Sequence, residues 1–218
     1  MFGQFGLDEF DSYGNATSLG SPPGGLSRNS VVAASVAGGG LFGSGDEAFV
    51  IGADQAIYVW VDKHWNLVDK TFRAQFVSLS ATPDNTVFAV TASGKLYQET
   101  ESVKINVNGM TFPRTFQTYW VGHDISPWWL TFTPTISADL DASGQSEVYA
   151  VDGTGSLGRF DQGVYSGPLW TDVADVSGAD GGEYYHVQGS RYVSMLGSKK
   201  ISNEGYLNGT DLGSANLS

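Results

Sequence analysis

The chain has 218 residues, of which 41% are hydrophobic, enough to bury the core of one all-β domain or of two small ones. Its net charge of -12 disfavours nucleic acid and anionic membranes as partners, and the absence of cysteine excludes disulfides, zinc–thiolate sites and thiol nucleophiles. The N-terminus lacks the basic and apolar regions of a signal peptide, and no segment approaches the roughly 20 apolar residues of a membrane span. We therefore expect neither a signal peptide in this chain nor insertion into a membrane.

Residues 1–30 are rich in Gly, Ser, Asn and Pro, and include the run Ser21-Pro22-Pro23-Gly24-Gly25. This composition predicts a flexible arm without regular structure. Several apolar side chains favour an alternative, in which the arm packs on a neighbouring subunit. These residues are Phe2, Phe5, Leu7, Phe10 and Tyr13.

A short pattern then returns four times between residues 31 and 200. Each copy has an aromatic residue, Ile or Val two places later, and an apolar residue eight places after the aromatic; the aromatics are Phe49, Phe88, Tyr149 and Tyr185. This alternation around a tight turn is typical of a β-hairpin. A further β-like run precedes each hairpin, at residues 31–36, 76–81, 135–140 and 172–176. Units of at least three strands that repeat along a chain predict an all-β array.

The spacing of the aromatics sets the size of the unit. The step is 39 residues from the first to the second, 61 to the third and 36 to the fourth, so the unit is 36–39 residues and the second one holds an enlarged hairpin. Residues 103–112 predict that hairpin, with Asn108-Gly109 as the preferred pair of a type I′ turn. Residues 116–120 and 128–132 are two aromatic strand candidates, and residues 201–218 predict an irregular tail.

Residues 31–200 resemble the blades of tectonin-like and tachylectin-like β-propellers, whose repeats also look like those of bacterial surface proteins. The most similar stretch is residues 86–97, T-V-F-A-V-T-A-S-G-K-L-Y. The resemblance implies a β-propeller-like array that binds carbohydrate between or on top of its blades, at an extracellular or cell-surface location. Four units of unequal length predict an incomplete propeller, or one that a partner chain completes.

Residues 139–147 carry a second resemblance, to the calcium loops of integrin-type (FG-GAP-like) propeller repeats, through the order D-x-D-x-S-G-x-x-E. Ca²⁺ takes about six to eight oxygen ligands, which alternate residues of a tight loop can direct inward. The resemblance implies that the ligands are the side chains of Asp139, Asp141, Ser143 and Glu147 and the backbone carbonyl of Gln145. The alternative is a polar hairpin turn whose Asp side chains bond their own backbone.

The number of aromatic residues favours a surface that binds sugars. Aromatic faces stack on the C–H side of sugar rings, while Asn, Asp and Gln bond the hydroxyls. Trp128 and Trp129 are adjacent on an expected strand, so one should be buried and the other exposed. The alternative is that the aromatics all pack in the core or between blades. The candidate ligand-binding residues are Trp65, Tyr119, Trp120, Trp128 and Trp129.

Catalytic motifs are missing from the sequence, which has no G-x-S-x-G, no P-loop and no H-E-x-x-H, and only three scattered histidines. We therefore expect a non-catalytic binding module for a glycan or surface polysaccharide. The alternative is a structural or assembly subunit of an extracellular or surface particle. In that case a homo-oligomer or larger assembly would use the N-terminal arm and the open edges of the array.

Overall fold

All regular elements in the described part of the chain are strands, and every strand pair is antiparallel. The all-β class predicted from the sequence is confirmed. In this same part, no helix is long and apolar enough to cross a bilayer. The computed structural model describes residues 2–3, 6–10, 16–23, 25, 34–37, 47–61, 63–68, 75–106, 115–141, 143–179, 183–188, 192–196 and 209–211.

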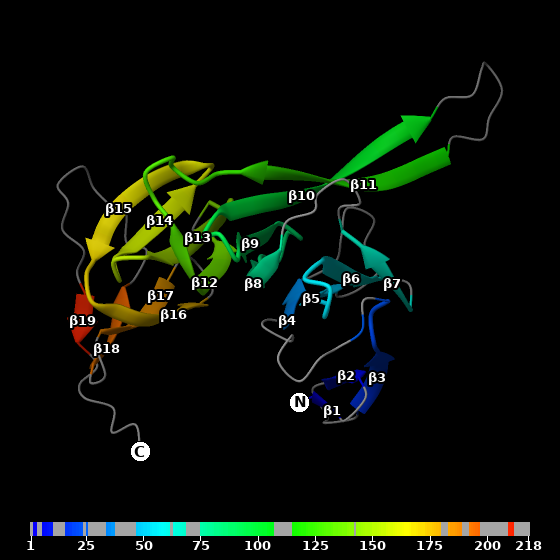
Figure 1. The fold of residues 1–218 in the computed structure, drawn as a ribbon, viewed down its shortest axis with the longest axis horizontal. Helices are drawn as coiled ribbons and strands as arrows, with labels where there is room; N and C mark the ends of the chain where they lie inside the picture. The colour runs from blue at the N-terminus through cyan, green and yellow to red at the C-terminus, as the bar shows by residue number, and fades with distance from the viewer. Residues whose placement is uncertain are drawn as a thin grey trace.

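Four of the five sheets have four strands each in chain order, and we call them blades 1 to 4. They follow one another along an arc that does not close (Figure 1). Blade 1 contains β4 (Ala34–Ala37), β5 (Glu47–Ile51), β6 (Ile57–Val61) and β7 (His64–Leu67). Blade 2 contains β8 (Phe76–Ala81), β9 (Val87–Thr91), β10 (Leu96–Asn106) and β11 (Thr115–Asp124). Blade 3 contains β12 (Phe132–Leu140), β13 (Ser146–Asp152), β14 (Leu157–Asp161) and β15 (Val164–Trp170). Blade 4 contains β16 (Val173–Ala179), β17 (Glu183–Gln188), β18 (Tyr192–Leu196) and β19 (Gly209–Asp211).

The four predicted repeats are therefore four blades, each with its repeated hairpin as the second and third strands. The β-like run before each hairpin is the first strand, as expected. The fourth strand is the one that the repeat pattern did not contain. In blade 4 this strand is β19, which comes from the segment expected to be an irregular tail.

The cores lie between the blades. The repeated aromatic packs toward the next blade in all three junctions: Phe49 lies in the cluster shared by blades 1 and 2, Phe88 in that of blades 2 and 3, and Tyr149 in that of blades 3 and 4. Because neighbouring residues of a strand point to opposite faces, Ala89 and Ala150 pack toward the preceding blade. The alternation in each repeat thus serves two junctions.

Backbone hydrogen bonds also join successive blades. The turn between the second and third strands of one blade accepts a bond from the residue that begins the first strand of the next. The bonds run from Phe76 N to Gln55 O (3.0 Å), from Phe132 N to Gly94 O (2.8 Å) and from Val173 N to Gly155 O (2.9 Å).

The second unit does hold an enlarged hairpin, β10 and β11, which extends beyond the other sheets (Figure 1), but its return strand begins at Thr115 and not within the predicted residues 103–112. The two strands pair from Tyr97 opposite Asp124 to Asn106 opposite Thr115. The predicted Asn108-Gly109 turn lies outside the described residues. A two-residue turn at Asn108-Gly109 would pair residue 106 with residue 111. In the structure, Asn106 is instead opposite Thr115, four residues later in the sequence.

Residues 1–30, predicted to be an arm without regular structure, contain a three-stranded sheet of β1 (Phe2–Gly3), β2 (Gly6–Phe10) and β3 (Ala16–Gly20). Neither β2 nor β3 has a regular apolar–polar alternation, so local sequence carries little strand signal there. The pairing of the two strands with each other supplies the backbone hydrogen bonds that the composition did not predict.

Candidate functional site

Two adjacent indoles stand out on the surface between blades 2 and 3. Trp128 is 86% exposed and Trp129 is 62% exposed, whereas most aromatic side chains of the described residues are buried or partly buried. Their ring centroids lie 5.5 Å apart with the planes at 84°, an edge-to-face arrangement. Both indoles keep most of their surface available to a ligand.

The expectation that residues 128–132 form a strand, with one Trp buried and one exposed, is wrong for the two tryptophans. Residues 127–130 form a β-turn closed by the bond from Leu130 N to Pro127 O (3.0 Å), and β12 begins only at Phe132. Trp128 and Trp129 occupy the two central positions of this turn. Central turn residues project away from the chain, so both indoles reach solvent.

The turn is held at both of its ends. On the side of blade 2, Ile125 N donates to Leu96 O (3.0 Å) and the Ser126 hydroxyl accepts from Leu96 N (2.6 Å). On the side of blade 3, Gly153 N donates to Thr131 O (2.8 Å). Both blades therefore fix the position from which the tryptophans project.

Exposed polar side chains precede and follow this turn in the sequence. His123 and Asp124 precede the turn, and Thr131 follows it. The Asp124 carboxylate lies 3.9 Å from Lys95 Nζ, and both groups are about a third exposed, so screening by water leaves each available to a further partner. An apolar platform flanked by hydrogen-bonding groups suits a ligand with both apolar faces and hydroxyls.

The other candidate aromatics are not brought to this platform. Trp65 is partly buried, packs on Trp60 with centroids 5.2 Å apart, and donates from Nε1 to Leu19 O at 2.8 Å. This is the packing alternative given above. Tyr119 and Trp120 belong to β11, opposite Ser102 and Glu101, but their side chains lie outside the described residues.

The predicted calcium loop is the turn between β12 and β13. The Asp141 carboxylate accepts three hydrogen bonds through Oδ1, from Ser143 N (2.8 Å), Ser143 Oγ (2.7 Å) and Gln145 N (2.8 Å). These bonds, led by that from the Gln145 amide, hold the pKa of Asp141 below its ordinary value. Gly144 takes φ of +79° at the tightest point of the turn.

Glu147 has a different partner from the one predicted. Its side chain is fully buried and accepts from Arg159 at 2.6 Å (Nε) and 2.5 Å (Nη2), while Arg159 also reaches Asp161 at 3.2 Å. Burial raises the pKa of Glu147, and Arg159 opposes that rise. Sequence reasoning missed Arg159, because only the register of β13 with β14 places it beside Glu147.

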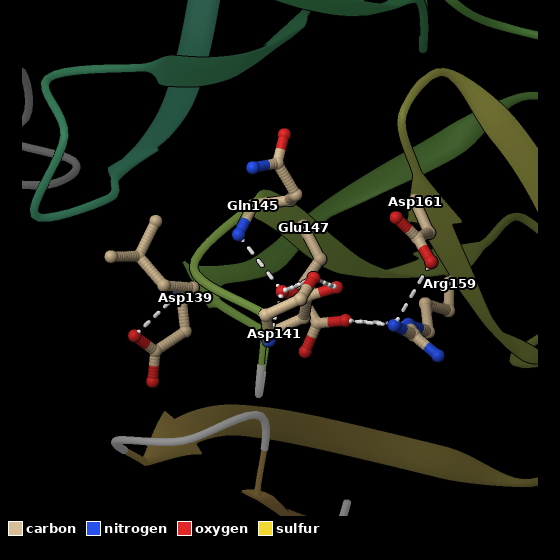
Figure 2. Close-up of polar contacts among 8 residues, drawn as sticks. Asp139, Asp141, Gln145, Glu147, Arg159 and Asp161 are labelled. Atoms are coloured by element: carbon tan, nitrogen blue, oxygen red, sulfur yellow. Dashed lines mark hydrogen bonds and ion pairs between the residues drawn. The ribbon is translucent and has the colours of Figure 1, made fainter. Parts of the chain in front are cut away.

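The five predicted calcium ligands do not converge in this geometry. Asp139 accepts from the backbone of Leu140 (2.7 Å) and points away from Asp141 and Glu147 (Figure 2). Within the described residues, no group of three or more His, Cys, Asp or Glu side chains is placed to hold a metal ion. The hydrogen bonds match the alternative of a polar turn, and a calcium cage would require Glu147 to leave Arg159. Calcium binding here stays a prediction.

No protein-family model matches the sequence, and no curated protein matches it. Among solved structures, the chain is similar to the Dos1 propeller, with 10% sequence identity and a TM-score of 0.48. The match covers 94% of this chain and 51% of that one, so the chain spans about half the length of that structure. The blade architecture described above follows from the strand pairing itself.

Proposed function

We propose that this chain is a non-catalytic binding module that recognises carbohydrate through the turn of Trp128 and Trp129. The observation that carries the proposal is the exposure of both indoles, at 86% and 62%, on a turn that two blades hold in place. Adjacent exposed aromatics contribute nothing to their own core, and such surfaces mark ligand or partner sites.

The chemistry of the platform favours sugars over other ligands. Indole faces stack on the C–H side of a pyranose, and the polar side chains of the same connection can bond its hydroxyls. The net charge of -12 disfavours an anionic polysaccharide, so a neutral glycan is the preferred class. The resemblance to tectonin-like repeats supports the same function, together with an extracellular or cell-surface location.

The proposal is tested by two substitutions at the turn, Trp128→Ala and Trp129→Ala, each screened on a glycan array beside the wild type. Loss of a central aromatic contact costs about 2 kcal/mol, so affinity for the bound glycan should fall about 30-fold. Circular dichroism and melting temperature should stay unchanged, because neither indole is buried. Val164→Ala, at an exposed apolar residue of β15, is the matched control and should bind like the wild type.

Three results would decide against parts of this proposal. If both Trp variants bind the glycan as tightly as the wild type does, the binding site is not the turn of Trp128 and Trp129. A folded wild-type chain that binds no neutral glycan would refute the function. The array is run with calcium and with a chelator, and binding that survives the chelator would remove calcium at residues 139–147 as a requirement.

A further inference from the structure

One face of blade 1 is covered by the segment that precedes it. Leu19 is 6% exposed and packs in one cluster with Val50 and Tyr58, which are themselves buried. Pro22 is buried as well, whereas Ala16 and Ser18 are exposed. Among residues 16–23 and 25, Leu19 therefore provides the apolar contact with blade 1.

Two hydrogen bonds fix this segment, and one of them repeats a feature of the blades. Trp65 Nε1 donates to Leu19 O (2.8 Å). In addition, a backbone amide in the turn of blade 1 donates a hydrogen bond to the carbonyl oxygen of Gly25. In blades 2 and 3, the equivalent turn amide donates to the carbonyl oxygen of the residue just before the first strand of the same blade. These bonds run from Ala53 N to Gly25 O (2.9 Å), from Ala92 N to Gln75 O (2.7 Å) and from Gly153 N to Thr131 O (2.8 Å).

The covered face of blade 1 corresponds to the faces of blades 2 and 3 that pack against the preceding blade. Val50 and Tyr58 stand at the repeat positions that Ala89 and Tyr97 hold in blade 2. Ala89 and Tyr97 pack against blade 1, and the equivalent Ala150 of blade 3 packs against blade 2. Blade 1 thus presents to residues 16–25 the surface that its successors present to a whole preceding blade.

We propose that residues 16–25 are a cap on a blade-binding face, and that a second copy of this chain docks there through its blade 4 when the cap is displaced. The occupant is a second copy because the repeated aromatics of blades 1 to 3 pack toward the following blade, and Tyr185 holds that repeat position in blade 4, which is the last blade of the arc. Blade 4 of the same chain is not that occupant, since the arc does not close (Figure 1). A non-reciprocal contact of this type joins copies head to tail.

The test uses the full chain with Leu19→Asp, which places a charge in the contact and leaves blade 1 unaltered. Ala16→Asp is the matched control, because it adds the same charge at an exposed position of β3. Mass is measured by light scattering over a range of concentrations. We expect Leu19→Asp to reach at least about twice the mass of the wild type and of Ala16→Asp at high concentration.

Hydrogen exchange of three equivalent amides shows whether the cap alone has moved. At a concentration below association, the Ala53 amide of Leu19→Asp should exchange at least about tenfold faster, with Ala92 and Gly153 unchanged. If Leu19→Asp fails to fold, Leu19→Ala should give the same pattern with a smaller change. An accelerated Ala53 amide without any rise in mass would refute the docking face, and an unchanged Ala53 amide would refute the cap.

Discussion

Glu147 and Arg159 form the most buried ion pair of the described residues, with the two side chains 1% and 17% exposed. A carboxylate removed from water is costly unless its charge is compensated, and Arg159 provides that compensation with two donors. Glu147 lies in the part of β13 by which this strand exceeds β9, on the face that also carries Tyr149, and Arg159 lies on the neighbouring strand β14. The role of the pair in this geometry is to satisfy a charge in the junction with blade 4.

Arg159→Met should destabilise the protein by about 3–5 kcal/mol at pH 7, because it leaves Glu147 buried without its cation. The loss should shrink on acidification. Glu147 has a raised pKa in the folded state, so the folded protein binds its proton at a pH where the unfolded chain has released it. Stability therefore returns as the pH falls through the folded pKa toward the unfolded value of about 4.3.

Urea unfolding at pH 7 and pH 5 measures this difference. The matched control is the double variant Glu147→Gln with Arg159→Met, which has no carboxyl at residue 147, so its stability should lack the gain on acidification that Glu147 contributes. An equal deficit of the single variant at both pH values would show that Glu147 does not titrate as its burial requires.

The sequence of residues 139–147 could not distinguish a calcium loop from a self-bonded turn. Both use an Asp at the start, a small polar residue and Gly144 at a positive φ, and only the calcium loop also requires Glu147. The deciding residue is Arg159, which is remote in sequence and meets Glu147 only through the pairing of β13 with β14. Charge compensation of this kind depends on register, and no local pattern reports it.

Among the elements, the connection that carries Trp128 and Trp129 depends on the tight turn at Gly94. Gly94 has φ of +78°, and a Cβ there would lie 2.9 Å from Thr131 Cβ and 3.2 Å from Phe132 O. Gly155 is its equivalent in blade 3, with φ of +80° and nothing within 4 Å of an added Cβ. The two glycines share a positive φ, which would strain any residue with a Cβ, and they differ in contact with the next blade.

Gly155→Ala should cost about 1–2 kcal/mol from its positive φ alone, and Gly94→Ala about 1–3 kcal/mol more from the clash. Only Gly94→Ala should also weaken glycan binding, because Thr131 and Phe132 form the base of the Trp turn. Thermal unfolding and titration with a glycan found on the array measure the two effects. Equal stability losses, or a binding loss in Gly155→Ala alone, would contradict the coupling of Gly94 to the turn.

At this scale the sequence predicted the repeated strands well and their connections less well. The hairpins at Phe49, Phe88 and Tyr149 were predictable because one alternating pattern packs two junctions at once. The Trp128-Trp129 pair was assigned to a strand because aromatic residues favour strands. These residues form a turn and not a strand because of the hydrogen bond from Leu130 N to Pro127 O and the contacts with blades 2 and 3. Those contacts depend on the tertiary structure, which local sequence does not report.

For the whole molecule, the N-terminal segment changes how assembly is understood. The composition predicted a flexible arm, with packing on a neighbouring subunit as the alternative, whereas Leu19 of this segment packs on blade 1 of its own chain. Composition could not predict this, because Gly, Ser and Pro fix neither a partner nor a direction. Leu19 is the informative residue, and its burial is known only from the fold.

The array also predicts how the chain unfolds. Each junction buries its own cluster between two successive blades, so stability should behave as a sum of blades and nearest-neighbour contacts. Phe49 and Phe88 are equivalent residues, 0% and 2% exposed, at the first and second junctions. Replacing either by Ala should cost about 3–5 kcal/mol at its junction.

The two substitutions should differ in cooperativity. Phe88→Ala weakens the central junction, so blades 1–2 and blades 3–4 should unfold in two urea transitions, each with a lower m-value than the wild type. Phe49→Ala weakens only the first junction, so blade 1 should be lost early while blades 2–4 unfold together. Far-UV circular dichroism follows the transitions, and exchange of the Ala92 and Gly153 amides reports blades 2 and 3 separately. A single transition with the wild-type m-value in Phe88→Ala would mean that the junctions are coupled through the whole array, and that nearest-neighbour contacts alone do not determine its stability.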